Sequence, residues 1–362
     1  MLQIKFGNKI KTQNKLLMIY KKNPQDPSLQ ALIKYIPKKI SNVEFFNFLD
    51  IERSRFKDEN LNFSIRLRNI VEKFKPTHIF CWLVYLNPDE IKFFKKIGIK
   101  IYAAVNGFSS LHSGLYKDQK LYFETLKALD GYFVPHRPHI KQLKKHKINA
   151  IEMPFFYDPE IYKPINKYLK SFFKKADIFF VGNMSNVNIK NTQSNYRKLI
   201  IDEIGEYFSL KIISNYTNFS SKIKVIKSTK SEKKINFYAN ISTSSLCFDY
   251  FPDIKIGKKS YDNVIEPYDD KYKYVIRPRV FAMMGAGAPV FVEKHNEIER
   301  FFQNNKNIIL WKNKDDLFKK LNHYLKFRSE LFEIGQNGLK EVSLNHTVSK
   351  RLDELIIPEI FN

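Results

Sequence analysis

The chain has 362 residues, of which 43% are hydrophobic and 15% aromatic, so its length and composition fit about two globular domains. With only 12 glycines and 15 prolines, it is neither collagen-like nor broadly disordered. The longest apolar run, Val280–Val292, is shorter than the about 18 residues that a membrane-spanning helix needs, and the N-terminus is too polar for a secretory signal. Two cysteines, Cys81 and Cys247, exclude a disulfide framework and a cysteine-based zinc cluster, and they fit a reducing cytoplasm.

The net charge is +25, from 62 Lys and Arg against 37 Asp and Glu. Such a charge indicates attraction to nucleic acid or to an anionic membrane surface. However, 51 of the basic residues are scattered lysines and only 11 are arginines, whereas arginine is the better reader of bases and phosphates. Lysine, asparagine, isoleucine and phenylalanine are residues that AT-rich codons favour. The charge therefore indicates a weak attraction to anionic lipid or a polyanionic acceptor rather than dedicated nucleic-acid binding.

The first half of the chain alternates between short apolar runs and helical spacing of apolar residues. The apolar runs predict strands at 16–20, 43–48, 78–86, 99–105 and 131–134. The helical spacing predicts helices at 29–36, 61–74, 87–97 and 121–129. Strands and helices that alternate at this spacing are typical of a parallel sheet with crossover helices.

A proline-rich stretch without periodicity, which begins at 151–164, separates the two halves, and we expect the linker over 154–172. The second half then resumes the alternation. It predicts strands at 177–181, 210–214, 241–244, 288–292 and 308–311. It predicts helices at 196–208, 228–239, 279–284, 298–302 and 315–325, with a polar, irregular segment at 255–270. The predicted fold is therefore α/β, with two doubly wound domains and a ligand in the cleft between them.

Familiar catalytic and nucleotide-binding motifs are absent from the sequence. There is no Walker loop, Gly-x-Gly-x-x-Gly, His-Glu-x-x-His or Gly-x-Ser-x-Gly. The adjacent pairs at 269–270 and 315–316 are interpreted as solvated carboxylates, although such pairs can bind Mg²⁺. His136 and His139 flank Arg137–Pro138, and we interpret them as part of a polar loop rather than as metal ligands. We therefore expect no metal site and no bound cofactor.

The segment Asp177–Asn183 (DIFFVGN) is the first of two that carry chemistry. Its apolar strand runs directly into Gly182 and Asn183. A glycine at a strand end lets a ligand approach the backbone closely, because no Cβ intervenes. Strand ends of this kind contact ligands in open sheets. An ordinary strand-terminating glycine is the alternative interpretation.

The second segment that carries chemistry is Arg277–Glu293 (RPRVFAMMGAGAPVFVE). Arg277 and Arg279 stand at the start of a predicted helix, where free backbone N–H groups and the positive end of the helix dipole suit a phosphate. An arginine adds a forked donor for a diphosphate. A Gly287–Ala288–Pro289 turn then leads into a strand. A buried helix, turn and strand with two surface arginines is the alternative.

A third segment, Asn106–Gly114 (NGFSSLHSG), follows the strand predicted at 99–105. His112 is a candidate general base for a substrate hydroxyl, because an ordinary histidine titrates near pH 6.5. Asn106 and Ser110 are candidate polar contacts on the same side. A solvated or capping histidine is the alternative.

The second half resembles the C-terminal domain of group 1 glycosyltransferases of the GT-B architecture and, more narrowly, the spore maturation protein CgeB-like family. The matching pieces are 151–164 (IEMPFFYDPEIYKP), 177–183 (DIFFVGN), 279–292 (RVFAMMGAGAPVFV), 298–302 before 308–309, and 346–351 (HTVSKR). The resemblance covers about 200 residues from 150 onward. The first half agrees only in the alternation of its elements.

The resemblance implies two Rossmann-like domains that face each other across a cleft. It implies an N-terminal acceptor domain at 1–153, a linker at 154–172, a C-terminal nucleotide-sugar donor domain at 173–345, and a final helix at 346–362 that packs back towards the first domain. It also implies sugar transfer without an essential metal. Gly182 and Asn183 then lie near the donor phosphates, Arg279 falls on the arginine of the family's Arg-x-Phe, and Ala288 and Pro289 fall on the turn after that helix.

One departure from the family pattern concerns a carboxylate. Where the broader group has an acidic residue after the Phe, this chain has Ala282, and Tyr274 stands eight residues before it, so the Glu-x7-Glu pair is absent. Glu266, Asp269 and Glu293 are the candidate substitutes for a sugar or ribose contact. The sequence leaves open which of them serves, and whether transfer retains or inverts the anomeric configuration.

The leading hypothesis is a cytoplasmic, metal-independent hexosyltransferase that moves a sugar from a UDP-, GDP- or CMP-linked donor to a surface-glycan, lipid-linked or protein acceptor. Peripheral contact with the inner face of an anionic membrane is compatible with it. Two alternatives stay open: a non-catalytic module of the same fold that binds a nucleotide sugar or a glycan, and a basic nucleic-acid-binding protein.

Overall fold

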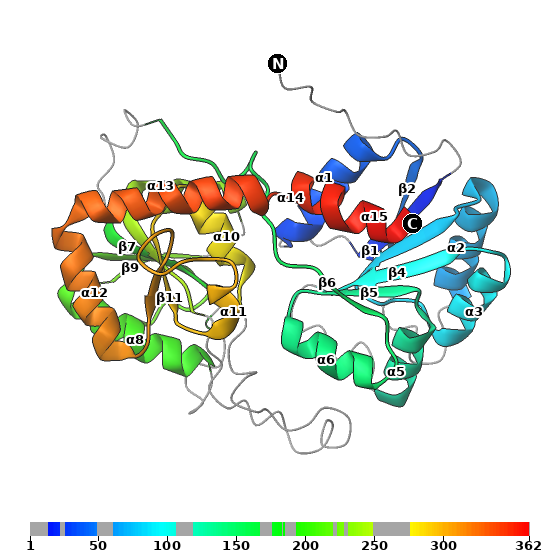
Figure 1. Ribbon diagram of the computed structural model, residues 1–362, viewed down its shortest axis with the longest axis horizontal. Helices are drawn as coiled ribbons and strands as arrows, with labels where there is room; N and C mark the ends of the chain where they lie inside the picture. Colours follow the sequence, from blue (N-terminus) through cyan, green and yellow to red (C-terminus); the bar gives the residue numbers. More distant parts are fainter. Residues whose placement is uncertain are drawn as a thin grey trace. The chain divides into compact units, whose positions relative to one another are not determined.

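The computed structural model describes residues 14–21, 26–48, 61–105, 119–166, 176–182, 184, 193–219, 223–227, 231–248 and 276–361. The chain forms two compact units (Figure 1). Unit 1 consists of Met1–Pro154 together with Ser349–Asn362, and unit 2 of Phe155–Val348. Each unit contains one six-stranded sheet in which every strand pairing is parallel. The α/β fold with two doubly wound sheets, predicted from the alternation of elements, is confirmed.

Unit 1 has the strand order β2-β1-β3-β4-β5-β6. Its strands are β1 (Leu16–Lys21), β2 (Val43–Phe48), β3 (His78–Trp82), β4 (Lys100–Ala104), β5 (Gly131–Val134) and β6 (Ala150–Glu152). Its helices are α1 (Pro27–Lys39), α2 (Leu61–Phe74), α3 (Pro88–Lys96), α5 (Gln119–Ala128) and α6 (Arg137–Lys145). The strand order reverses between β1 and β3, as in flavodoxin-like sheets, so ligands are expected at the carboxyl ends of these two strands.

Local sequence explains where the best-defined helix of unit 1 begins and ends. The Asn87 side chain accepts a hydrogen bond from the Glu90 backbone N–H at 2.8 Å, and the Glu90 carboxylate accepts one from the Asn87 N–H at 3.0 Å. This reciprocal capping box, with Pro88 at the first helical position, starts α3. Gly98, at φ +87°, adopts the left-handed conformation just after α3.

Two elements of unit 1 differ from the sequence-based expectation. The strand predicted over 78–86 ends at Trp82, because Leu83 has φ +73° and cannot continue an extended strand. The polar loop expected around His136 and His139 is instead the start of α6, where both side chains are buried. The error arose because α6 is short and mostly polar, with Ile140 and Leu143 as its aliphatic residues.

Unit 2 has the strand order β12-β11-β10-β7-β8-β9. Its strands are β7 (Ala176–Val181), β8 (Leu210–Ser214), β9 (Lys224–Lys227), β10 (Ser242–Leu246), β11 (Val290–Glu293) and β12 (Ile309–Trp311). Its helices are α8 (Gln193–Tyr207), α9 (Glu232–Ile241), α10 (Pro278–Gly285), α11 (Asn296–Glu299), α12 (Lys314–Lys326) and α13 (Arg328–Asn345). In sequence order this is the 3-2-1-4-5-6 arrangement of a Rossmann sheet, and the order reverses between β7 and β10.

Alternate residues of these strands supply two cores, one on each face of the unit 2 sheet. Phe179, Val290 and Val292 pack with α9 and α10 on one face. Phe180 and Phe291 pack with α8 and α12 on the other. Since both faces are covered, β7, β11 and β12 are apolar at most positions, which is why apolar runs predicted them.

The segment 155–166, within the expected linker 154–172, packs into unit 2. Phe155, Tyr157 and Tyr162 are at most 6% exposed. Tyr157 also pairs with the end of α13, because its N–H donates to the His346 carbonyl at 3.1 Å and its carbonyl accepts from the Val348 N–H at 3.0 Å. The proline-rich stretch therefore supplies aromatic residues to the core of unit 2.

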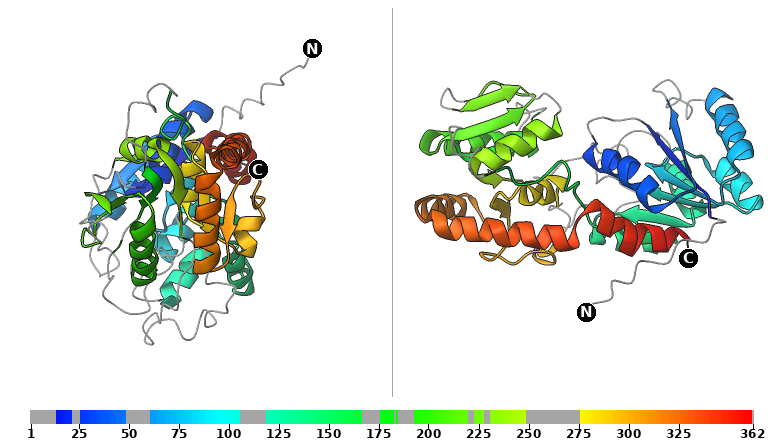
Figure 2. Two further views of the ribbon diagram at one scale, coloured as in Figure 1. Left: turned by 90° about the vertical axis from the view of Figure 1, so that its left-hand side faces the viewer. Right: turned by 90° about the horizontal axis from the view of Figure 1, so that it is seen from above.

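The C-terminal residues complete unit 1. Helix α14 (Val348–Arg351), the π-helical segment η3 (Leu352–Ile356) and α15 (Ile357–Phe361) follow α13, and η3 lies along α1 (Figures 1 and 2). An ion pair of 2.7 Å between Lys39 and Asp353 joins them. No helix among the described residues is long and apolar enough to cross a membrane.

Candidate functional site

The carboxyl edge of the unit 2 sheet, at the reversal between β7 and β10, is the candidate site. Gly182 follows β7 there, and its N–H donates to the Ile213 carbonyl at 3.1 Å. A Cβ on Gly182 would stand 2.5 Å from the Phe180 ring. The glycine is therefore needed for packing as well as being at the expected ligand edge. Asn183 lies outside the described residues.

Helices α9 and α10 bring their N-termini to this edge, because each follows a carboxyl end of the parallel sheet and runs back along it. Ser231 caps α9 by accepting a hydrogen bond from the Lys234 N–H at 3.4 Å. Helix α10 begins after Arg277 with Pro278 at its first position. Glu232 and Arg279 thereby lie in the first turns of two neighbouring helices.

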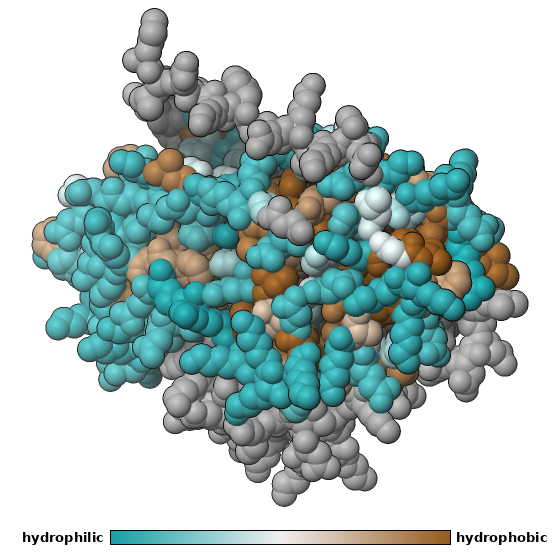
Figure 3. All heavy atoms as spheres, turned by 45° about the vertical axis from the view of Figure 1, so that its right-hand side comes forward, coloured by the Kyte–Doolittle hydropathy of each residue, from teal (hydrophilic) through white to brown (hydrophobic). Residues whose placement is uncertain are grey.

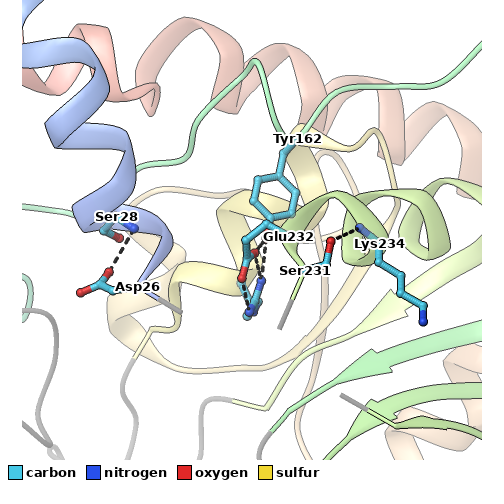
Figure 4. A network of polar contacts seen from close by, with 7 residues as sticks. Asp26, Ser28, Tyr162, Ser231, Glu232 and Lys234 are labelled. Atoms are coloured by element: carbon cyan, nitrogen blue, oxygen red, sulfur yellow. Dashed lines mark hydrogen bonds and ion pairs between the residues drawn. The ribbon is translucent and has the colours of Figure 1, made fainter. Parts of the chain in front are cut away.

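The Arg279 guanidinium forms a two-pronged ion pair with the Glu232 carboxylate. Nη1 donates to Oε2 at 2.6 Å and Nη2 to Oε1 at 3.1 Å. Nη1 also donates to the Tyr162 hydroxyl at 2.6 Å, and that hydroxyl donates to Glu232 (Figure 4). The side chains are partly buried, at 28% exposure for Arg279 and 13% for Glu232. Such a pair is less screened by solvent and salt than an exposed one.

Sequence reasoning found Arg279 but missed Glu232 and Tyr162. The residues around Glu232 carry one usable signal: Ser231–Glu232 is a capping residue followed by an acid in the first turn of a predicted helix. The sequence around Tyr162 gives no such signal, because Tyr162 lies 117 positions before Arg279 in a stretch without periodicity.

Glu293 is at the same edge, since it ends β11. It is 3% exposed and is paired in register with Trp311 at the end of β12. Of the three carboxylates proposed as sugar or ribose contacts, it is the one within the described residues. Glu266 and Asp269 lie outside them.

The structure does not bring Gly287, Ala288 and Pro289 to this edge. They connect the end of α10 to the start of β11, which is the amino edge of a parallel sheet. Ala288 is 3% exposed, and Pro289 lies against α13, where a Cβ on Gly335 would stand 3.0 Å from the proline ring. The turn thus packs α10 against α13, so an expected role in donor binding does not fit its position.

The candidate acceptor residues Asn106, Ser110 and His112 lie outside the described residues, which stop at Val105 just after β4. At the reversal of the unit 1 sheet the described acid is Asp26. Its Oδ1 accepts from the Ser28 and Leu29 N–H groups, each at 3.1 Å, and its Oδ2 accepts from the Trp82 indole at 2.8 Å. Figure 4 shows the contact with Ser28. Asp26 thus holds the start of α1 to the end of β3.

The expected absence of a metal site stays a prediction. The described ranges contain no group of three or more His, Cys, Asp or Glu side chains that could hold a metal ion. His136 and His139, with ring centroids 5.4 Å apart, are a buried pair rather than part of a larger cluster there.

Comparison with known proteins finds a family similarity over the part of the chain that contains Glu232 and Arg279. Residues 232–357, from Glu232 to the first residue of α15, match a family described as glycosyl transferase-like. The matched residues make up less than half of the chain. No curated protein matches the chain in sequence.

Solved structures of GT-B glycosyltransferases share the fold. Sucrose-phosphate synthase from Thermosynechococcus elongatus superposes with a TM-score of 0.63 at 9% identity, over 94% of this chain and 97% of that one. A glycosyltransferase from Rickettsia africae gives 0.60 at 10% identity, over 96% and 98%. The Anabaena protein Alr3699/HepE, solved with UDP-glucose, gives 0.60 at 9% identity, over 93% and 97%. The shared fold and the family match together support a glycosyltransferase of the GT-B type.

Proposed function

We propose that this chain transfers a hexose from a nucleoside-diphosphate sugar to a glycan, lipid-linked or protein acceptor. The observation that carries the proposal is Arg279, a cationic fork at the carboxyl edge of a Rossmann sheet, within the glycosyl transferase-like region. Arg277 adds a second cation at the same helix start. Cations at this edge favour a diphosphate leaving group, because they stabilise the charge that develops as the sugar departs.

The donor and the metal requirement belong to the same proposal. Alr3699/HepE has been solved with UDP and with UDP-glucose, which favours a UDP-linked donor as the first to try. Two arginines and the start of α10 supply positive charge of the kind that a metal ion supplies elsewhere, so we propose transfer without an essential metal. Membership of the CgeB-like subgroup is proposed on the same residues, Arg279 to Val292.

The test is release of nucleotide from a panel of UDP-, GDP- and CMP-linked sugars, in the presence of EDTA and without an acceptor. We expect slow release from one donor, because water substitutes for the acceptor. Release that needs added Mg²⁺ contradicts metal independence alone. A panel in which no donor is hydrolysed and no nucleotide stabilises the protein against heat contradicts the proposed function.

A non-catalytic homologue is the second candidate, and Ala282 favours it. The residue is 5% exposed on α10, one turn after Arg279, where the broader group has a carboxylate. Thermal stabilisation by one nucleotide, with neither hydrolysis nor transfer in the presence of candidate acceptors, supports this candidate over the enzyme.

Peripheral contact with an anionic membrane, on the cytoplasmic side, is proposed for the outer surface of α2 and α3. Apolar residues interrupt the hydrophilic surface of the protein as small areas (Figure 3). Ile65 on α2 is 46% exposed, and Ile97, just after α3, is 55% exposed. Phe93 on α3 is 45% exposed. The Arg68 guanidinium lies 5.2 Å from the centroid of the Phe93 ring. Apolar and basic side chains together are suited to a lipid surface with negative charge. Binding to vesicles that contain phosphatidylglycerol, but not to neutral vesicles, is the expected result.

A further inference from the structure

Side chains of unit 2 engage both terminal nitrogens of the Arg279 guanidinium. Glu232 takes one hydrogen from Nη1 and one from Nη2, which is the end-on pair of the guanidinium. The Tyr162 hydroxyl accepts from Nη1 as well. These contacts fix both the tilt of the planar group and its rotation about the side-chain axis.

Two further donors form the side-on pair of the same guanidinium. They are Nε–H and the second hydrogen of Nη2, which lie next to each other on one edge of the plane. No acceptor on a described residue meets either of them. Because the Arg279 side chain keeps 28% exposure, it is accessible to a ligand. Two parallel N–H donors at fixed spacing match two oxygens of a phosphate or diphosphate.

The two partners of Arg279 are themselves held in place. Tyr162 is 2% exposed, and its hydroxyl both accepts from Arg279 and donates to Glu232. Glu232 is 13% exposed in the first turn of α9, which Ser231 caps. The Lys163 and Ile165 N–H groups that follow Tyr162 are bound by Asn236 and Asn240 of α9, at 3.2 and 2.8 Å. Tyr162 and Glu232 therefore form a rigid support for Arg279.

We propose that Glu232 and Tyr162 are positioning residues that aim the side-on pair of Arg279 at two oxygens of the donor diphosphate. This inference rests on the proposed function, because it needs a nucleoside diphosphate as ligand. Glu232 reduces the net charge at Arg279, so its own contribution is to orient the side-on N–H pair, while Arg277 and the start of α10 keep this edge cationic. In the opposite arrangement, Glu232 competes with the diphosphate for Arg279, and its removal strengthens binding. The two arrangements therefore predict opposite changes in the affinity for the diphosphate when Glu232 is replaced.

Calorimetry of UDP and of uridine binding to the full chain distinguishes the positioning role from competition. GDP and guanosine serve as a second nucleotide and nucleoside pair. In Glu232→Gln the amide presents an N–H group to Arg279, and the guanidinium loses its orientation. We expect UDP to bind about tenfold more weakly, within the range for one lost charge-assisted hydrogen bond, and uridine to bind unchanged. Tyr162→Phe keeps the ring and removes one contact, so a weakening of about threefold is expected for UDP. Arg279→Lys keeps the charge but not the fork, and it should match Glu232→Gln.

Asp202→Asn is the matched control. It breaks a partly buried ion pair with Lys198 on α8, on the other face of the same sheet, and should leave the affinity for UDP unchanged. A merely structural role of Glu232 predicts equal losses for UDP and uridine, together with a lower melting temperature, and that result overturns the proposal. Equal or tighter binding of UDP by Glu232→Gln overturns it in favour of competition.

The failure of the proposed function gives a different result. If the unaltered chain binds neither UDP nor GDP, the assignment of a nucleoside-diphosphate donor fails, and the positioning role fails with it. If Glu232→Gln does not fold, Tyr162→Phe carries the test, because it keeps the volume of the buried ring. The proposal is then contradicted if Tyr162→Phe has the same ratio of UDP affinity to uridine affinity as the unaltered chain.

Discussion

Asp26 shows how one buried carboxylate can hold two elements of unit 1 together. It is 9% exposed and accepts two N–H groups at the start of α1 and the indole N–H of Trp82 at the end of β3. Leu83, directly after Trp82, has φ +73°, a conformation that costs a non-glycine residue about 1 kcal/mol or more. The Asp26 contacts compensate for this strain at the point where the strand order of the sheet reverses.

Replacing Asp26 tests this anchoring role. In Asp26→Ala the cap of α1 is lost, at about 1 kcal/mol, and the buried Trp82 N–H loses its acceptor, at about 1–3 kcal/mol. We expect the free energy of unfolding of unit 1 to fall by about 2–4 kcal/mol. Urea unfolding followed by tryptophan fluorescence measures it. Asp89→Ala, at a side chain 95% exposed, is the control and should change little. An unchanged midpoint in Asp26→Ala contradicts the anchoring role.

At the same scale, sequence reasoning could predict Arg279 but not its environment. An arginine before a helix of small residues is visible in the sequence, and its helix start is a local property. Whether a carboxylate opposes it depends on the strand order, because Glu232 reaches Arg279 only when the chain crosses from β9, at one edge, to β10 beside β7. Tyr162 arrives from a segment without any periodicity. Non-local partners of this kind leave no pattern along the chain.

Among the elements, α13 shows how glycines bring a helix close to its neighbours. A Cβ on Gly338 would stand 2.7 Å from the backbone oxygen of Asn307 and 3.1 Å from the Met284 side chain. A Cβ on Gly335 would stand 3.0 Å from the Pro289 ring. Helix α13 therefore seals the turn at 287–289, which explains why that turn is buried.

A Gly338→Ala substitution separates packing from helix propensity. Alanine favours a helix interior over glycine by about 1 kcal/mol, so an exposed site would gain stability. Here the added methyl meets the Asn307 backbone, which cannot move as a side chain can, and we expect a net loss of about 1–3 kcal/mol in unit 2. Thermal unfolding measures it, with the exposed Gln336→Ala of the same helix as control. A raised melting temperature in Gly338→Ala would mean that α13 can shift without cost.

Element prediction succeeded where burial is uniform along a strand and failed where it is not. β1, β5 and β8 are buried at nearly every position, and their apolar runs predicted them to within one residue. β6 has three residues and β9 four, with lysine at both ends of β9, so neither contains an apolar run. Helix α13 was missed because its two glycines and its polar residues hide the apolar period.

At the scale of the whole molecule, unit 1 is built from both ends of the chain. The last helix, α15, lies against the start of β3, where the Phe361 ring meets the His78 ring edge-on at a centroid distance of 4.7 Å. His78 is 7% exposed, and its Nδ1 bonds to the Thr77 hydroxyl at 2.8 Å while its Nε2 has no hydrogen-bond partner among the described residues. Alternation of strands and helices predicted two sheets, but it could not reveal this contact across 283 positions.

The contact makes unit 1 sensitive to acid. Burial lowers the pKa of His78 to about 4, with the neighbouring Lys100 acting in the same direction and Asp130 opposing it. A histidine whose folded-state pKa is depressed favours the fold while it is neutral. Its contribution is complete above pH 6.5, the ordinary value, and is lost as the pH falls from 6.5 towards 4. The loss is on the order of 3 kcal/mol over that interval.

Trp82 and Trp311 allow this loss to be assigned to unit 1. They are the two tryptophans of the chain and lie in different units, so a Trp311→Phe background leaves Trp82 as the single reporter of unit 1. Urea unfolding in that background should give a midpoint that falls between pH 6.5 and 4, and His78→Gln, which does not titrate there, should flatten the dependence. If the slope persists in His78→Gln, carboxylates of unit 1 cause it instead. A flat profile in both proteins would mean that the protonated ring is accommodated, and hence that α15 moves away from β3 in acid.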